Sequence, residues 1–221
     1  MKIAEELQAV ERWRQSHGEE LANSVSHGAG FLGAAVGAPI LLNAAVGRGN
    51  TAFTIGTAIF AFTMVLLYFG SAVYHSWPRT PFKGVLQKLD HSAIFLLIAG
   101  TYTPFALGPL RGPWGWSILV VIWALAALGV SLKTIKGAAH RPRLAVGLYL
   151  VMGWLVLLVM RPLTLAVDGW TLFWLIAGGL VYTSGVFFFL NDHKRYCHFV
   201  WHLFVLGGTC CHYFAVLSCA V

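Results

Sequence analysis

Charged side chains are scarce in this chain, since aspartate, glutamate, lysine and arginine together make up only 10% of its 221 residues. A soluble domain carries about 25%. Hydrophobic residues account for 58%, and the mean hydropathy is +0.72. This composition excludes an ordinary water-exposed surface. Short segments of alternating polarity, typical of a membrane β-barrel, are also missing, so we expect an all-α integral membrane protein.

Cysteines are few and confined to one end of the sequence, at Cys197, Cys210, Cys211 and Cys219. None has a possible partner earlier in the chain, so a disulfide framework is not expected. No short apolar core followed by a small-residue cleavage site opens the sequence, which argues against a cleavable signal peptide. The GxGxxG pattern at Gly28, Gly30 and Gly33 lacks a preceding strand. With Gly37, we interpret it as a place where helices approach closely.

Long apolar stretches dominate what remains. Each is close to the roughly 20 residues that cross a bilayer as a helix, and they fall at about 26–46, 52–75, 91–110, 114–132, 144–160, 170–190 and 198–219. Short connections make consecutive helices antiparallel neighbours. The sequence therefore predicts a seven-transmembrane helix bundle over residues 26–221. A cytoplasmic or interfacial segment over residues 1–25 precedes it, with an amphipathic stripe at 3–13.

Basic residues are distributed unevenly between the two ends of these spans. Twelve lysines and arginines fall in the N-terminal tail and the even-numbered connections, and three fall in the others. By the positive-inside rule, this distribution places the N-terminus in the cytoplasm and the C-terminus outside. The expected location of the protein is the inner (plasma) membrane. The net charge of +7 is then explained by basic loops against anionic headgroups. Membrane lipids are the expected partners, nucleic acid is not, and a homo-oligomer stays open.

Three histidines are predicted to meet near the cytoplasmic face. His198 and His202 are four residues apart, on one face of the last span. Histidine inside a membrane is costly and points to a function or a partner. His75 ends the second span at the same depth. Three imidazoles plus one open position form the ligand set of catalytic zinc sites, and nitrogen donors suit Zn²⁺ better than Mg²⁺ or Ca²⁺.

Two further polar residues are expected beside this zinc site. Asp90 opens the third span, where it can deprotonate a water activated by the ion, and Ser71 lies one turn from His75, where it can stabilise an oxyanion. Structural interpretations stay open for both, because Asp90 can be a helix N-cap and Ser71 can bond a carbonyl of the preceding turn. His212 lies about 21 Å along the helix from His198, too far to share the ion, and is expected to make an interhelical hydrogen bond.

Four strings extend along nearly the whole chain: EELANSVSHGAG (19–30), GSAVYHSWP (70–78), KLDHSAIFLLIAGTYTP (88–104) and HFVWHLFVLGGTCCH (198–212). In this order they resemble the bacterial hemolysin III family of the progestin and adipoQ receptor (PAQR) superfamily. The resemblance implies seven helices with a cytoplasmic N-terminus. It also implies zinc ligands at His75, His198 and His202, with Asp90 and Ser71 around a zinc-bound water. The superfamily's zinc pattern gives no role to His27 and His91, which remain candidates for positions next to the ligands.

Three functions are compatible with these features. Superfamily relatives resemble alkaline ceramidases, which implies zinc-dependent hydrolysis of a lipid amide or ester. The second function is a non-enzymatic regulator of membrane energetics or fluidity, in which zinc is a structural ion. The third is a cytolytic or pore-forming hemolysin, as the family name suggests. The scarcity of charge along the spans disfavours a wide aqueous pore, and the hydrolase is our first hypothesis.

Overall fold

The computed structural model describes residues 15–134 and 142–220, and this part of the chain contains helices and no strand. The helices are α2 (His17–Gly47), α3 (Thr51–Ser76), α4 (Lys83–Leu107), α5 (Pro113–Thr134), α6 (Pro142–Trp154), α7 (Met160–Ala166), α8 (Gly169–Leu190) and α9 (Cys197–Ala220), with the 3₁₀ segment η2 (Leu155–Val159) between α6 and α7. The stripe expected at 3–13, and with it most of the segment 1–25, lies outside the described residues.

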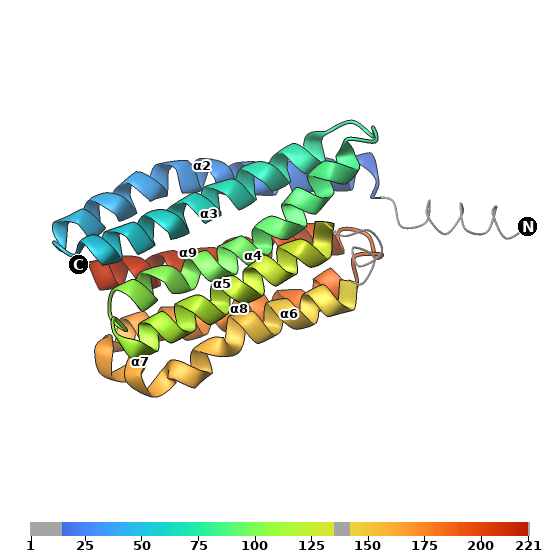
Figure 1. Ribbon diagram of the computed structural model, residues 1–221. Helices are drawn as coiled ribbons and strands as arrows, with labels where there is room; N and C mark the ends of the chain where they lie inside the picture. Colours follow the sequence, from blue (N-terminus) through green and yellow to red (C-terminus); the bar gives the residue numbers. More distant parts are fainter. Residues whose placement is uncertain (1–14, 135–141, 221) are drawn as a thin grey trace, which may run out of the picture.

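The helices lie side by side in one bundle (Figure 1). Helix α2 packs against α3 and α9, α8 packs against α9, and α4 contacts α3, α5, α6 and α9. Fully buried aromatic and aliphatic side chains such as Phe53, Phe60 and Leu41 fill the centre. Helix α2 begins at one end of the bundle and α9 ends at the other (Figure 1), as an odd number of passages requires.

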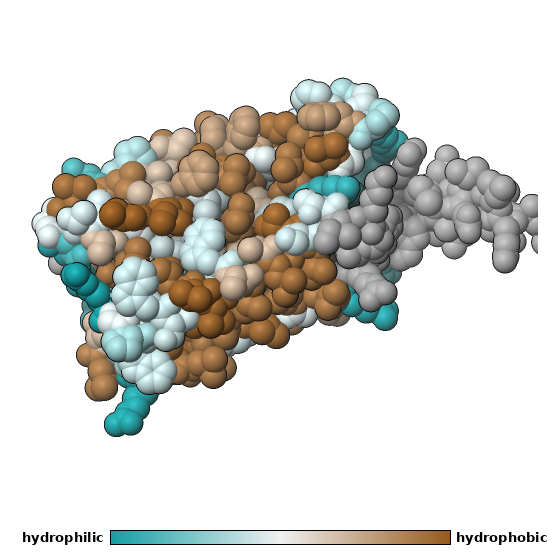
Figure 2. Space-filling view, viewed as in Figure 1, coloured by the Kyte–Doolittle hydropathy of each residue, from teal (hydrophilic) through white to brown (hydrophobic). Residues whose placement is uncertain are grey.

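The outer surface of the bundle is apolar over most of its length. Figure 2 shows hydrophobic residues along the visible flank and hydrophilic residues gathered toward the two ends. Six helical stretches of the described chain are long and apolar enough to cross a membrane: α2, α3, α5, the stretch from Arg143 to Ala166, α8 and α9. Helix α4 is not among them, and its polar residues include Asp90 and His91. The protein is therefore a multi-pass helical membrane protein.

Two helix starts differ from the sequence-based expectation. Helix α2 begins at His17, nine residues before the predicted span, because Ser16 and Glu19 form a reciprocal capping box there. Helix α4 begins at Lys83, so Asp90 lies two turns inside the helix and is only 6% exposed. The interpretation of Asp90 as an N-cap is therefore wrong, and its carboxylate needs another explanation.

The fifth span is longer than predicted and is interrupted near its middle. It runs through α6, η2 and α7 to Ala166, six residues past the expected end. The Tyr102 hydroxyl donates to the carbonyls of Met152 and Gly153 and accepts a bond from the Val156 N–H. A side chain inserted into the helical hydrogen-bond ladder is a recognised cause of such a break. The α4 side chain thus fixes the place where α6 ends.

The close helix approach predicted from the N-terminal glycines is partly confirmed. A Cβ on Gly30 would lie 2.6 Å from Leu206 Cδ2, and one on Gly37 would lie 3.1 Å from the Tyr213 ring. These glycines let α9 approach α2 closely. The same expectation is wrong for Gly28 and Gly33, which have no neighbouring atom within 4 Å of a Cβ.

Candidate metal centre

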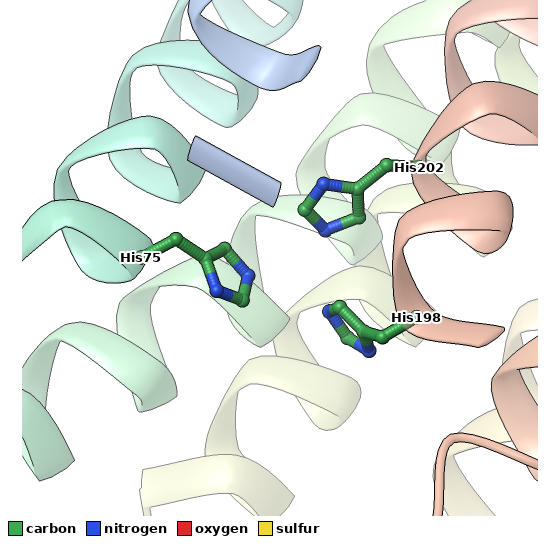
Figure 3. A group of neighbouring side chains, drawn as sticks. All are labelled: His75, His198 and His202. Atoms are coloured by element: carbon green, nitrogen blue, oxygen red, sulfur yellow. The ribbon is translucent and has the colours of Figure 1, made fainter. Parts of the chain in front are cut away.

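Three imidazoles meet where the end of α3 faces the start of α9. His75 comes from the last turn of α3, and His198 and His202 come from the first two turns of α9. One nitrogen from each ring lies within 4.8 Å of the other two, and all three side chains are buried. Figure 3 shows the three rings converging on a common space between the helices. The i, i+4 spacing therefore brings the rings together as the sequence predicted.

Ring nitrogens at this point lack protein partners. His75 Nε2 and both nitrogens of His198 are buried and make no hydrogen bond with the described part of the chain. Buried polar atoms are nearly always satisfied in folded proteins, so three converging imidazoles with free nitrogens fit a bound cation. Imidazole is a ligand for zinc, copper, iron and nickel. The geometry supports a metal site, and the donor set alone does not choose among these ions.

The first turns of α2 supply residues that the sequence reasoning did not single out. The Nδ1 of His75 donates to Glu20 Oε2 at 2.8 Å, and Glu20 Oε1 lies 2.8 Å from Lys83 Nζ. The Nδ1 of His202 lies 3.3 Å from the Asn23 carbonyl oxygen and 3.2 Å from Ser26 Oγ. All three α2 residues fall inside the string 19–30, which was the available signal.

His27 also lies at this centre, which gives it a position that the family's zinc pattern does not assign. Its ring stacks on His202, with 3.6 Å between centroids and an angle of 6° between planes. Neither of its nitrogens has a hydrogen-bond partner within residues 15–134 and 142–220, and the side chain is buried. The expectation that His27 lies next to the ligands is consistent with this packing.

Two of the three candidate ligands share a small cavity with the other predicted residues. Its volume is about 10 Å³, close to the minimum that holds one water molecule. Its polar lining consists of His27, Ser71, Asp90, His91, His198 and His202. The Ser71 hydroxyl is buried and bonds no carbonyl among the described residues, so the interpretation that it bonds a preceding carbonyl is wrong. Asp90 and Ser71 thus face the space beside two of the candidate ligands.

Two larger apolar cavities lie next to one another in the bundle, and one of them borders the small cavity. The first, about 90 Å³, shares Leu67, Ile94, Trp201 and Val205 with the small cavity. The second, about 70 Å³, shares Thr101, Tyr102, Gly153, Trp154, Gly179 and His212 with the first. The Nε2 of His212 lies 3.3 Å from the Leu175 carbonyl oxygen, which confirms the predicted interhelical bond. Apolar cavities therefore border the small cavity that two of the histidines line.

Lys133 is a further residue whose place the sequence did not reveal. It was counted in a basic connection, yet it lies in the last turns of α5 and is only 6% exposed. It lies within range of an electrostatic interaction with Asp90. A buried cation therefore accompanies the acidic residue at this end of the bundle.

These features define a multi-pass helical membrane protein with a candidate three-histidine metal centre at one end of its bundle. The family model described as haemolysin-III related matches residues 15–213. The chain belongs to this family, so the resemblance noted in its sequence is confirmed.

Curated relatives match over most of their length. The hemolysin-3 homolog of Bacillus subtilis (strain 168) is 39% identical over 199 residues, covering 90% of this chain and 93% of the relative. Hemolysin-3 of Bacillus cereus is also 39% identical, over 90% of both chains. The human monocyte to macrophage differentiation factor is 30% identical over 217 residues, covering 93% of this chain and 86% of that protein.

Proposed function

We propose that this protein is a zinc-dependent hydrolase that cleaves an amide or ester bond of a membrane lipid. The observation that carries the proposal is the small cavity, where the side chains of His198 and His202 lie beside Asp90 and the buried hydroxyl of Ser71. Metal ligands, a carboxylate and a hydroxyl that face one small space are the groups that metal-assisted hydrolysis needs. The apolar cavities beyond it suit the hydrocarbon part of a lipid.

The chain's own residues would divide the chemistry between them. His75, His198 and His202 would hold the ion, which supplies polarisation of the scissile carbonyl and activation of water. The Asp90 carboxylate would take the proton from the attacking water. The Ser71 hydroxyl would donate a hydrogen bond to the oxygen on which negative charge develops. Apolar walls from Leu67 and Trp201 would keep bulk water away from the reacting bond.

The topology that the charge count predicts completes the proposal. With the N-terminus in the cytoplasm, the ends of α3 and α9 that carry the histidines lie at the inner leaflet of the plasma membrane. A lipid would then enter sideways between helices, with its polar linkage at the histidines and its chain in the apolar cavities. Membrane lipids are thus the partners in this proposal, and self-association of the protein is not required.

A structural zinc ion is the alternative that the ligand set allows. Structural zinc sites close their coordination sphere with four protein ligands, whereas catalytic sites keep one position open. Among the described residues, the group of metal-binding side chains contains three members. Two of these three ligands line a cavity that also contains a carboxylate, which favours a catalytic zinc ion over a structural one.

The test is hydrolysis by the purified full-length protein loaded with zinc. Fluorescent ceramide and a fluorescent acyl ester in mixed micelles serve as probes, and release of the labelled fatty acid is followed. We expect Asp90→Asn to lower turnover by about 10²–10⁴-fold, the usual contribution of a general base, with zinc content unchanged. Asp192→Asn, a change outside the cavity, serves as the matched control. Equal turnover by wild type and Asp90→Asn on every cleaved probe would refute the catalytic role of Asp90.

A further inference from the structure

The two carboxylate oxygens of Glu20 contact partners on different helices. Oε2 accepts the Nδ1–H of His75 on α3, and Oε1 pairs with Lys83 Nζ at the start of α4, both at 2.8 Å. The Lys83 ammonium also donates to the Trp77 carbonyl at 3.2 Å. Because Lys83 anchors one carboxylate oxygen, the other is held in place against the imidazole. Glu20 is therefore fixed in position before any ion binds.

The bond to Glu20 determines which nitrogen of His75 is available. A carboxylate can only accept, so the proton lies on Nδ1 and the lone pair lies on Nε2. Nε2 is the buried nitrogen without a partner. A carboxylate behind a histidine ligand fixes the ring orientation and raises the basicity of the ligating nitrogen. Glu20 thus prepares His75 to bind a cation through Nε2.

The next two turns of the same helix do the equivalent for His202. Its Nδ1 lies 3.3 Å from the Asn23 carbonyl oxygen, which can only accept and so draws the proton to Nδ1. Ser26 Oγ donates to the same carbonyl at 2.9 Å and lies 3.2 Å from Nδ1. This arrangement again leaves Nε2 as the nitrogen with a free lone pair. His198 has no hydrogen-bond partner at either nitrogen among the described residues, so hydrogen bonds from these residues orient His75 and His202 but not His198.

We propose that Glu20 is a positioning residue of the metal centre: together with the backbone at Asn23, it makes the first turns of α2 the element that fixes His75 and His202 for metal binding through Nε2. This inference rests on the proposed metal site. It adds Glu20, a side chain of α2, to the three histidines from α3 and α9. The early start of α2 at His17 matters for this contact, because Glu20 would not be part of a helix that began at residue 26.

The experiment measures zinc affinity of the full-length protein in detergent, by competition with a fluorescent chelator. We expect Glu20→Gln to bind zinc about 10–100-fold more weakly than wild type, the usual effect of losing a carboxylate behind a histidine ligand. Glu19→Gln is the matched control, because Glu19 contacts Ser16 and the Tyr196 N–H instead of a histidine. Its zinc affinity should equal that of wild type.

A second variant tests the contact between α2 and His202. It also keeps the inference testable if Glu20→Gln fails to fold. Ser26→Ala leaves the Asn23 carbonyl in place, so we expect a smaller loss of zinc affinity than for Glu20→Gln. Thermal unfolding of the metal-free proteins separates positioning from packing, since a packing role would lower the unfolding temperature of Glu20→Gln and leave its zinc affinity intact. Unchanged zinc affinity of Glu20→Gln would overturn this inference and leave the proposed metal site standing. Absence of zinc binding by wild type would overturn the proposed metal site itself.

Discussion

Zinc should stabilise the folded protein against heat, because the candidate ligands come from two helices that are far apart in sequence. His75 ends α3 and His202 lies near the start of α9, so one ion would tie these helices together. A ligand that binds only the folded state, at one hundred times its Kd, contributes about 2.7 kcal/mol. For a chain of this length each kcal/mol raises the unfolding temperature by about 2–4 °C. We therefore expect a rise of about 5–11 °C.

Removing one imidazole should abolish most of this rise. If His202→Ala weakens binding a hundredfold, the same zinc concentration contributes only about 0.4 kcal/mol, or about 1–2 °C. His212→Ala is the matched control, because it removes a histidine from the same helix. The His212 ring bonds the Leu175 carbonyl and lies outside the three-histidine group. It should keep the full zinc-dependent rise, whatever its effect on the metal-free protein.

The assay is thermal unfolding in detergent, followed by intrinsic fluorescence, with and without excess zinc after treatment with a chelator. Tryptophan is abundant in the chain, which makes the signal strong. The reasoning fails if wild type and His202→Ala shift equally with zinc, because the ion would then bind elsewhere. It also fails if neither protein shifts.

Two further predictions concern the bundle itself. A Cβ at Gly56 would lie 2.7 Å from Pro104 Cα, closer than the normal contact distance of about 3.5–4.0 Å. Gly56→Ala should therefore lower the free energy of unfolding, measured with a chemical denaturant, by about 1–3 kcal/mol. Gly70→Ala is the control, because Gly70 has open space around it, and it should not lower this free energy. The Thr171 N–H bond lowers the pKa of Asp168. The destabilisation by Asp168→Ala should therefore be full above a pH of about 4 and shrink as acid protonates the wild-type carboxylate; a pH-independent difference would contradict this.

Much of the architecture was predictable because it depends on local composition. Apolar runs of about 20 residues identify spans wherever they occur, and the predicted stretches correspond to the observed helices in order. The exact limits were not predictable from apolar length. Polar residues extended α2 to His17 through a capping box, and a tyrosine on α4 interrupted the fifth span. Capping and side-chain insertion are decided by single hydrogen bonds, which hydropathy does not register.

The candidate ligands were predictable for a similar reason. An i, i+4 pair shares a helix face by geometry alone, and the connection lengths put His75 at the same end as His198 and His202. The grouping of these three rings needed no knowledge of side-chain packing. Asp90 and Ser71 were proposed on the same topological grounds, and the structure places both at the same cavity. Their chemical roles stay predictions that the turnover assay addresses.

What the amino-acid order determined by itself is therefore the membrane-embedded helical class and the three histidines that meet at one end. Only the tertiary structure decided what lies behind and around those rings: Glu20 on His75, the stack of His27 on His202, and a buried Lys133 near Asp90. The stack joins residues 27 and 202, which lie 175 positions apart in the sequence. These contacts follow from how α2, α5 and α9 rotate and approach when they pack, and no local pattern encodes that rotation.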